Sequence, residues 1–125
     1  MSLTTWKING IELELDLSDA DVLEKYETAF ENMAKNEKNI SKDGKASERI
    51  RAACDMFKKL FIGLFGESAT ADIFKDVPTS ILRYEEIYDS FLEFASKQMQ
   101  ETTKIRNERY NKYIPNRQTR RAKKK

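Results

Sequence analysis

Apolar and polar residues alternate between positions 6 and 15, with Asn9-Gly10 in the middle. Alternation with a period of two is typical of a β-strand with one buried face. Asn-Gly favours the tight turn of a hairpin, because both turn positions adopt positive φ. The pattern therefore predicts a β-hairpin within residues 4–17. Its apolar face must pack on the rest of the protein, since an isolated hairpin is only marginally stable. The predicted register pairs Ile8 with Ile11, Lys7 with Glu12 and Trp6 with Leu13.

Apolar residues spaced three and four apart predict three helices after the hairpin and before Pro78. The first begins at Ser18, a residue type that caps helix N-termini, and its pattern fades in a polar segment. The second has the most regular apolar stripe, and Gly66 is a suitable C-terminal stop. Its phenylalanines are expected in the core. The third is short, is capped by Ser68 and ends at Phe74.

A fourth helix is predicted from about Thr79 to Tyr113, with Pro78 at its start. If unbroken, it would be about 50 Å long. Its main apolar stripe consists of Ile81, Tyr84, Tyr88, Phe91, Leu92, Ala95 and Met99.

Three further apolar residues of this helix, Ile87, Phe94 and Ile105, lie roughly 90° to one side of the main stripe. This wide apolar arc has two interpretations. The helix is buried between two neighbours in the same domain, or it presents a second surface to another subunit or to a client helix. On the second interpretation, these three residues contact a partner.

Charge divides the chain into an acidic body and a basic end. From Arg109 onward there are eight basic residues and no acidic one, whereas the first 108 residues carry a net charge of −6. Residues 115–125 contain no hydrophobic residue larger than alanine, so they are predicted to be a disordered tail after a single helical domain over residues 1–114. The expected class is mainly α, with an N-terminal β-hairpin and about four helices.

The residue content argues against catalysis. The 125 residues include no histidine and one cysteine, Cys54, which excludes a histidine-dependent nucleophile, a histidine-ligated metal and an internal disulfide. Glu85, Glu86 and Asp89 are interpreted as a solvated face. No phosphate-binding glycine motif occurs. We therefore expect a protein that is not an enzyme and has no cofactor or metal.

The sequence lacks an apolar stretch long enough to span a membrane, and a cytoplasmic location is expected.

Short motifs along nearly the whole chain resemble a family of small proteins from phages and prophages of Gram-positive bacteria. They include Asn9-Gly10-Ile11-Glu12-Leu13-Glu14-Leu15-Asp16, Glu24-Lys25-Tyr26-Glu27, Leu64-Phe65-Gly66-Glu67, and Asn116-Arg117 with Arg120-Arg121. These proteins are similar to tail assembly chaperones. The resemblance implies non-catalytic binding to the tape-measure protein and the major tail protein in the host cytoplasm, and a homo-oligomer stays open.

In the basic tail, Arg117, Arg120 and Arg121 are the candidate partner contacts. Two alternative functions remain. One is a nucleic-acid-binding or regulatory prophage protein that uses this tail through phosphate contacts. Against it stand the acidic body and the absence of aromatic residues for base stacking in the tail. The other is a minor structural protein of the virion, such as a head–tail connector.

Overall fold

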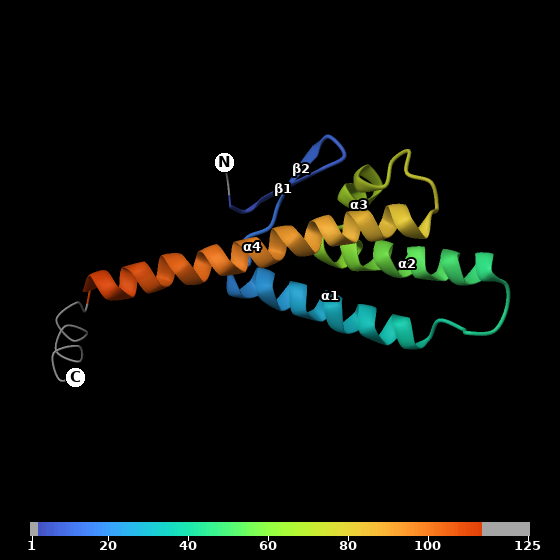
Figure 1. The fold of residues 1–125 in the computed structure, drawn as a ribbon, viewed down its shortest axis with the longest axis horizontal. Coiled ribbons are helices and arrows are strands. Elements are labelled where there is room, and N and C mark those ends of the chain that lie inside the picture. Colours follow the sequence, from blue (N-terminus) through green and yellow to red (C-terminus); the bar gives the residue numbers. More distant parts are fainter. Residues whose placement is uncertain (1–2, 114–125) are drawn as a thin grey trace.

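The computed structural model describes residues 3–113, so the predicted tail with Arg117, Arg120 and Arg121 lies outside the described residues. The chain is mainly helical, with an N-terminal antiparallel hairpin followed by four helices (Figure 1). The elements are β1 (Thr5–Ile8), β2 (Ile11–Glu14), α1 (Ala20–Lys38), α2 (Ala46–Phe65), α3 (Glu67–Ile73) and α4 (Ile81–Tyr113). The predicted fold class is confirmed.

The hairpin has the predicted register, with Ile8 opposite Ile11. Asn9 and Gly10 adopt φ values of 48° and 80°, as the tight turn requires. The Asn9 side chain also donates a hydrogen bond of 2.8 Å to the carbonyl oxygen of Ile73, at the end of α3. The turn residue thus joins the hairpin to the helical body.

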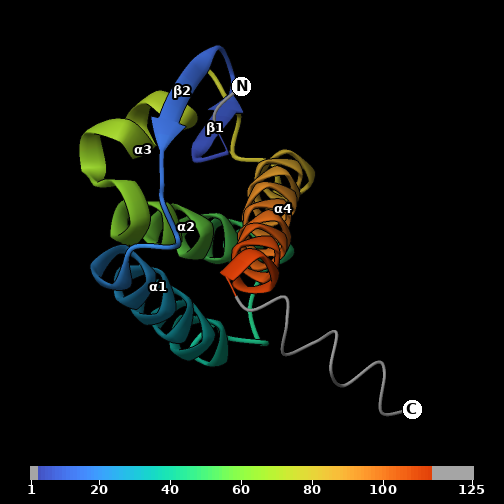
Figure 2. The ribbon, with the colours of Figure 1, turned by 90° about the vertical axis from the view of Figure 1, so that its left-hand side faces the viewer.

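Helix α2 lies in the middle of the molecule, and α4 packs against α2 and β1. Helix α1 packs along one side of α2, and the hairpin lies with α3 on the other side (Figure 2). The core between them is largely aromatic: Phe91 of α4 is fully buried and lies next to the rings of Trp6, Phe61 and Phe65. Trp6 stacks on Phe61 with ring centres 5.6 Å apart, so the largest apolar side chain of the hairpin lies at the centre of the helical body.

Two predicted helix caps are wrong by one or two residues. Asp19, not Ser18, caps α1, and its carboxylate accepts hydrogen bonds from two backbone N–H groups of the first turn. Ser18 instead donates its hydroxyl to Asp16. Gly66, not the predicted Ser68, occupies the N-cap position of α3, because at φ 91° it turns the chain directly from α2 into α3, which begins at Glu67.

The long fourth helix is continuous to Tyr113 and begins at Ile81, two residues later than predicted. Its start is delayed because the backbone N–H of Ser80 bonds to the carbonyl of Pro78 in a tight turn. Met99, predicted in the apolar stripe, is 38% exposed.

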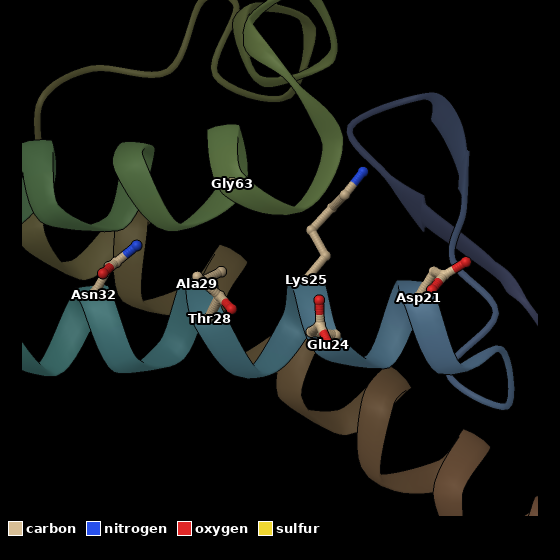
Figure 3. Close-up of a pocket in the computed structure, with 7 residues that line it drawn as sticks. All are labelled: Asp21, Glu24, Lys25, Thr28, Ala29, Asn32 and Gly63. Carbon is tan, nitrogen blue, oxygen red and sulfur yellow. The ribbon is translucent and has the colours of Figure 1, made fainter.

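Helices α1 and α2 approach closely where Gly63 faces Ala29, both labelled in Figure 3. A Cβ atom at Gly63 would lie 3.2 Å from the Cβ atom of Ala29. Gly63→Leu should therefore push the helices apart and lower the free energy of unfolding by about 1–3 kcal/mol, measured by urea denaturation. Gly63→Ala should cost less, because higher helix propensity offsets the tight contact. Equal stability of Gly63→Leu and the native chain would contradict this packing.

Candidate functional site

A groove of about 620 Å³ lies between the start of the chain and α4. Its apolar surface comes from Leu3 and Trp6 on one side and from Phe94 and Ile105 of α4 on the other. The indole Nε1 of Trp6 donates a hydrogen bond of 3.2 Å to the hydroxyl oxygen of Ser90, which holds the two walls together at one end. Three charged residues of α4 line the same groove, namely Glu93, Lys97 and Glu101.

Gln98 forms the base of the groove and fixes the chain on both sides of the hairpin. Its side chain is 1% exposed and accepts a hydrogen bond of 2.5 Å from the backbone N–H of Leu17. Its amide nitrogen donates to the carbonyl oxygens of Leu15 at 2.8 Å and Leu3 at 3.4 Å. Gln98 was not among the site residues predicted from the sequence. The available signal was its position seven residues after Phe91, where the buried stripe of α4 continues.

A smaller groove of about 300 Å³ adjoins the first and shares Leu3, Gln98 and Ile105 with it. Asp16, Arg106 and Arg109 line it, so its walls carry opposite charges. Two hydrogen bonds from Ser18 lower the pKa of Asp16, the larger effect coming from the Ser18 hydroxyl and the smaller from its backbone N–H. Asp16 is therefore ionised at neutral pH, facing the same groove as two arginines.

The three apolar residues predicted to contact a partner have different positions. Ile87 is 6% exposed and belongs to the core, so its prediction as a surface contact is wrong. The reason is that α4 packs against both α2 and β1, which buries the wider arc at this height. Phe94 is half-buried and Ile105 is 38% exposed. The structure brings these two together in one groove, 11 residues apart on α4.

The last part of α4, residues 103–113, extends away from the body as a helical arm (Figure 1). The arm includes the groove residues Ile105, Arg106 and Arg109. Every residue of the arm is exposed, including Tyr110 at 55% and Tyr113 at 77%. At 1.5 Å per residue the arm is about 17 Å long. It carries one acidic residue, Glu108, and four basic residues: Lys104, Arg106, Arg109 and Lys112.

The other candidate sites in the described part of the chain have fewer features of a binding or catalytic site. A shallow depression of about 300 Å³ lies at the seam between α1 and α2, where Lys25 and Asn32 extend from α1 towards α2 (Figure 3). Gly63, which has no side chain, is one of the residues that line it. Burial raises the pKa of the Cys54 thiol, which is 2% exposed, so Cys54 is a core residue. Glu85, Glu86 and Asp89 are exposed, as expected for a solvated face.

Within residues 3–113, no group of three or more cysteine, aspartate and glutamate residues is arranged to hold a metal ion. None of the helices in this range combines the length and the apolar character needed to cross a membrane.

No curated protein and no solved structure matches this chain significantly. One protein family does match: the model of DUF6673, a family of unknown function, aligns with residues 9–124. The match begins at the hairpin turn and includes α1 to α4, and with them the α4 wall of both grooves. The chain therefore belongs to the DUF6673 family.

Proposed function

We propose that this protein is a tail assembly chaperone of a phage or prophage, which binds the tape-measure protein and the major tail protein in the host cytoplasm without catalysis. The main support is the apolar groove between β1 and α4, which contains Phe94 and Ile105. Its volume of about 620 Å³ is enough for several apolar side chains of a client. The sequence resemblance supplies the identity of that client.

A tape-measure protein is long, helical and apolar along one face before the tail tube encloses it. Such a face aggregates when it is exposed to water. A chaperone must cover it with contacts that are weak enough to be released during assembly. A groove with apolar side chains on both walls and charged residues beside them suits this task, because the walls cover apolar side chains of the client while Glu93, Lys97 and Glu101 keep the complex hydrated. Many copies bound along one client would provide the strength that one copy lacks.

The proposal is tested by co-expression with the tape-measure protein of the same genome, measuring how much of that protein stays soluble and co-purifies. Ile105→Glu places a charge in the groove, and we expect recovery to fall about tenfold, since about 1.4 kcal/mol of lost binding has that effect. The matched control is Leu82→Glu, because Leu82 is also an exposed apolar residue of α4, at 68% exposure, but lies outside both grooves. Equal loss in both variants, or unaided solubility of the tape-measure protein, would reject the proposal.

Purified virions distinguish a chaperone from a structural protein of the particle. Mass spectrometry should detect the protein in infected cells and not in mature virions. Its presence at a fixed copy number per virion would favour the structural alternative instead.

The basic arm is the observation that favours nucleic acid as a second candidate partner, with four basic residues against Glu108 and with Tyr110 and Tyr113 exposed beside them. A mobility-shift titration separates the two functions. Tight binding to DNA or RNA that weakens strongly as salt increases would favour this candidate.

A further inference from the structure

One face of α4 carries charges of alternating sign over most of its length. In chain order these residues are Glu93, Lys97, Glu101, Lys104, Glu108 and Lys112. At 100° per residue they fall within an arc of about 100°, and they span about 29 Å of helix. Five of the six are exposed and Glu101 is partly exposed. The first three line the groove and the last three belong to the arm.

The order of these charges is antisymmetric about the middle of the face, between Thr102 and Thr103. Read in either direction from this point, each acidic residue on one side corresponds to a basic residue at the same distance on the other. The corresponding pairs are Glu101 with Lys104, Lys97 with Glu108, and Glu93 with Lys112. A second copy of the helix, turned by 180° about this point, would therefore place an opposite charge against each of the six.

Charges spaced three and four residues apart are more simply explained by ion pairs within one helix. In residues 3–113, however, the ion pairs are Lys7 with Glu12 and Lys59 with Asp55, so none of the six is paired with another described residue. The arm gives a second reason to expect a partner. A helical segment of 11 residues has little intrinsic stability in water, and this one exposes Tyr110 and Tyr113.

We propose that two copies of this chain associate through this face, with their α4 helices antiparallel and a twofold axis between Thr102 and Thr103. Each arm then lies along the groove half of the other copy's α4, so both arms are covered by the same symmetric contact. Phe94 and Ile105 border the charged face and supply apolar area to the interface. A parallel arrangement is disfavoured because it would place Glu93 against Glu93 and Lys97 against Lys97.

This interface has two expected properties. Ion pairs between exposed side chains are individually weak and are screened by salt, so the dimer should be readily reversible and favoured at low ionic strength. The second copy covers the α4 wall of the groove, so a ligand of the groove would compete with self-association. The inference does not depend on the proposed function, since it rests on the charges of α4 and on the exposed arm.

Sedimentation velocity of the full chain over a concentration series tests the interface. The dimer dissociation constant should rise about tenfold between about 20 mM and about 500 mM NaCl. At low salt, Lys104→Glu should raise it about tenfold, because the symmetric contact turns two attractive pairs into two repulsive ones. Lys42→Glu, which makes the same charge change in the loop before α2, should leave it unchanged.

The double variant Glu101→Lys/Lys104→Glu provides the decisive comparison. It restores opposite charges across the twofold axis but leaves like charges four residues apart within each helix, at positions 97 and 101 and at 104 and 108. Recovery of native self-association in the double variant would support the antiparallel register. Circular dichroism spectra confirm that each variant keeps its helices. A native chain that stays monomeric at low salt, or a double variant no better than Lys104→Glu alone, would overturn the proposal.

Discussion

Replacing Gln98 with leucine is expected to destabilise the protein by about 3–5 kcal/mol, although leucine fits the apolar pattern of α4. The native side chain satisfies the backbone N–H of Leu17 and the carbonyl oxygen of Leu15, both in buried surroundings. Leucine can do neither. Each buried polar group left without a partner costs about 1–3 kcal/mol, and the contact to Leu3 is lost as well. This loss is a large part of the roughly 5–15 kcal/mol by which a domain is stable.

Urea denaturation followed by circular dichroism measures this effect. Gln100→Leu is the matched control, because Gln100 is an exposed glutamine of the same helix whose side chain, among the residues that the structure describes, bonds to Ser96 alone. It should change the free energy of unfolding by less than about 0.5 kcal/mol. If both variants were equally stable, the hydrogen bonds of Gln98 would not hold the hairpin to α4.

Phe91→Ala is expected to lower the free energy of unfolding by about 3–5 kcal/mol, the range for removing a large aromatic side chain from a core. Phe91 is 0% exposed and lies where α4, α2, α1 and the hairpin meet. Six rings surround it, those of Trp6, Tyr26, Phe30, Phe61, Phe65 and Phe94. Removing its ring leaves a cavity that rigid neighbours from four elements cannot fill without moving apart.

Phe94→Ala is the control for this variant. Phe94 is half-buried, and Phe91 is its one neighbour among the described aromatic rings. Its loss should cost distinctly less than the loss of Phe91. Because Trp6 is the only tryptophan and its ring lies 5.3 Å from that of Phe91, its fluorescence should report the same unfolding transition as circular dichroism. A smaller loss from Phe91→Ala than from Phe94→Ala would contradict the position of Phe91 at the centre of the core.

Features defined by neighbours along the chain were predictable. Asn9-Gly10 within an alternating pattern determines the hairpin and its register, because turn geometry and side-chain alternation are both local. The apolar stripe of α2 and its end at Gly66 are determined by helical periodicity in the same way. The cap of α1 was predicted wrongly, since Asp19 and Ser18 are both good capping residues and the side chain of Ser18 is hydrogen-bonded to Asp16 instead.

The candidate site was predicted in part. Phe94 and Ile105 were predicted from their angular position on the helix and do line the groove. Ile87, predicted from the same position, is buried. Helical periodicity gives the direction in which a side chain points, but not which neighbouring element covers it at each position along the helix. The position of Gln98 on the stripe of α4 indicated burial, but its hydrogen bonds could not be predicted, because its partners Leu17, Leu15 and Leu3 are at least 81 residues away in sequence.

The order of residues alone specifies the helices and strands, the charge difference between body and end, and the antisymmetric order of charges along α4. These follow from residue types and from spacings within single elements. Packing between distant segments specifies that the hairpin lies against α4 rather than elsewhere, that Gln98 is buried, and that a groove and an exposed arm result. The physical reason is that packing between distant segments depends on which apolar faces meet, and several pairings of such faces satisfy the same sequence pattern.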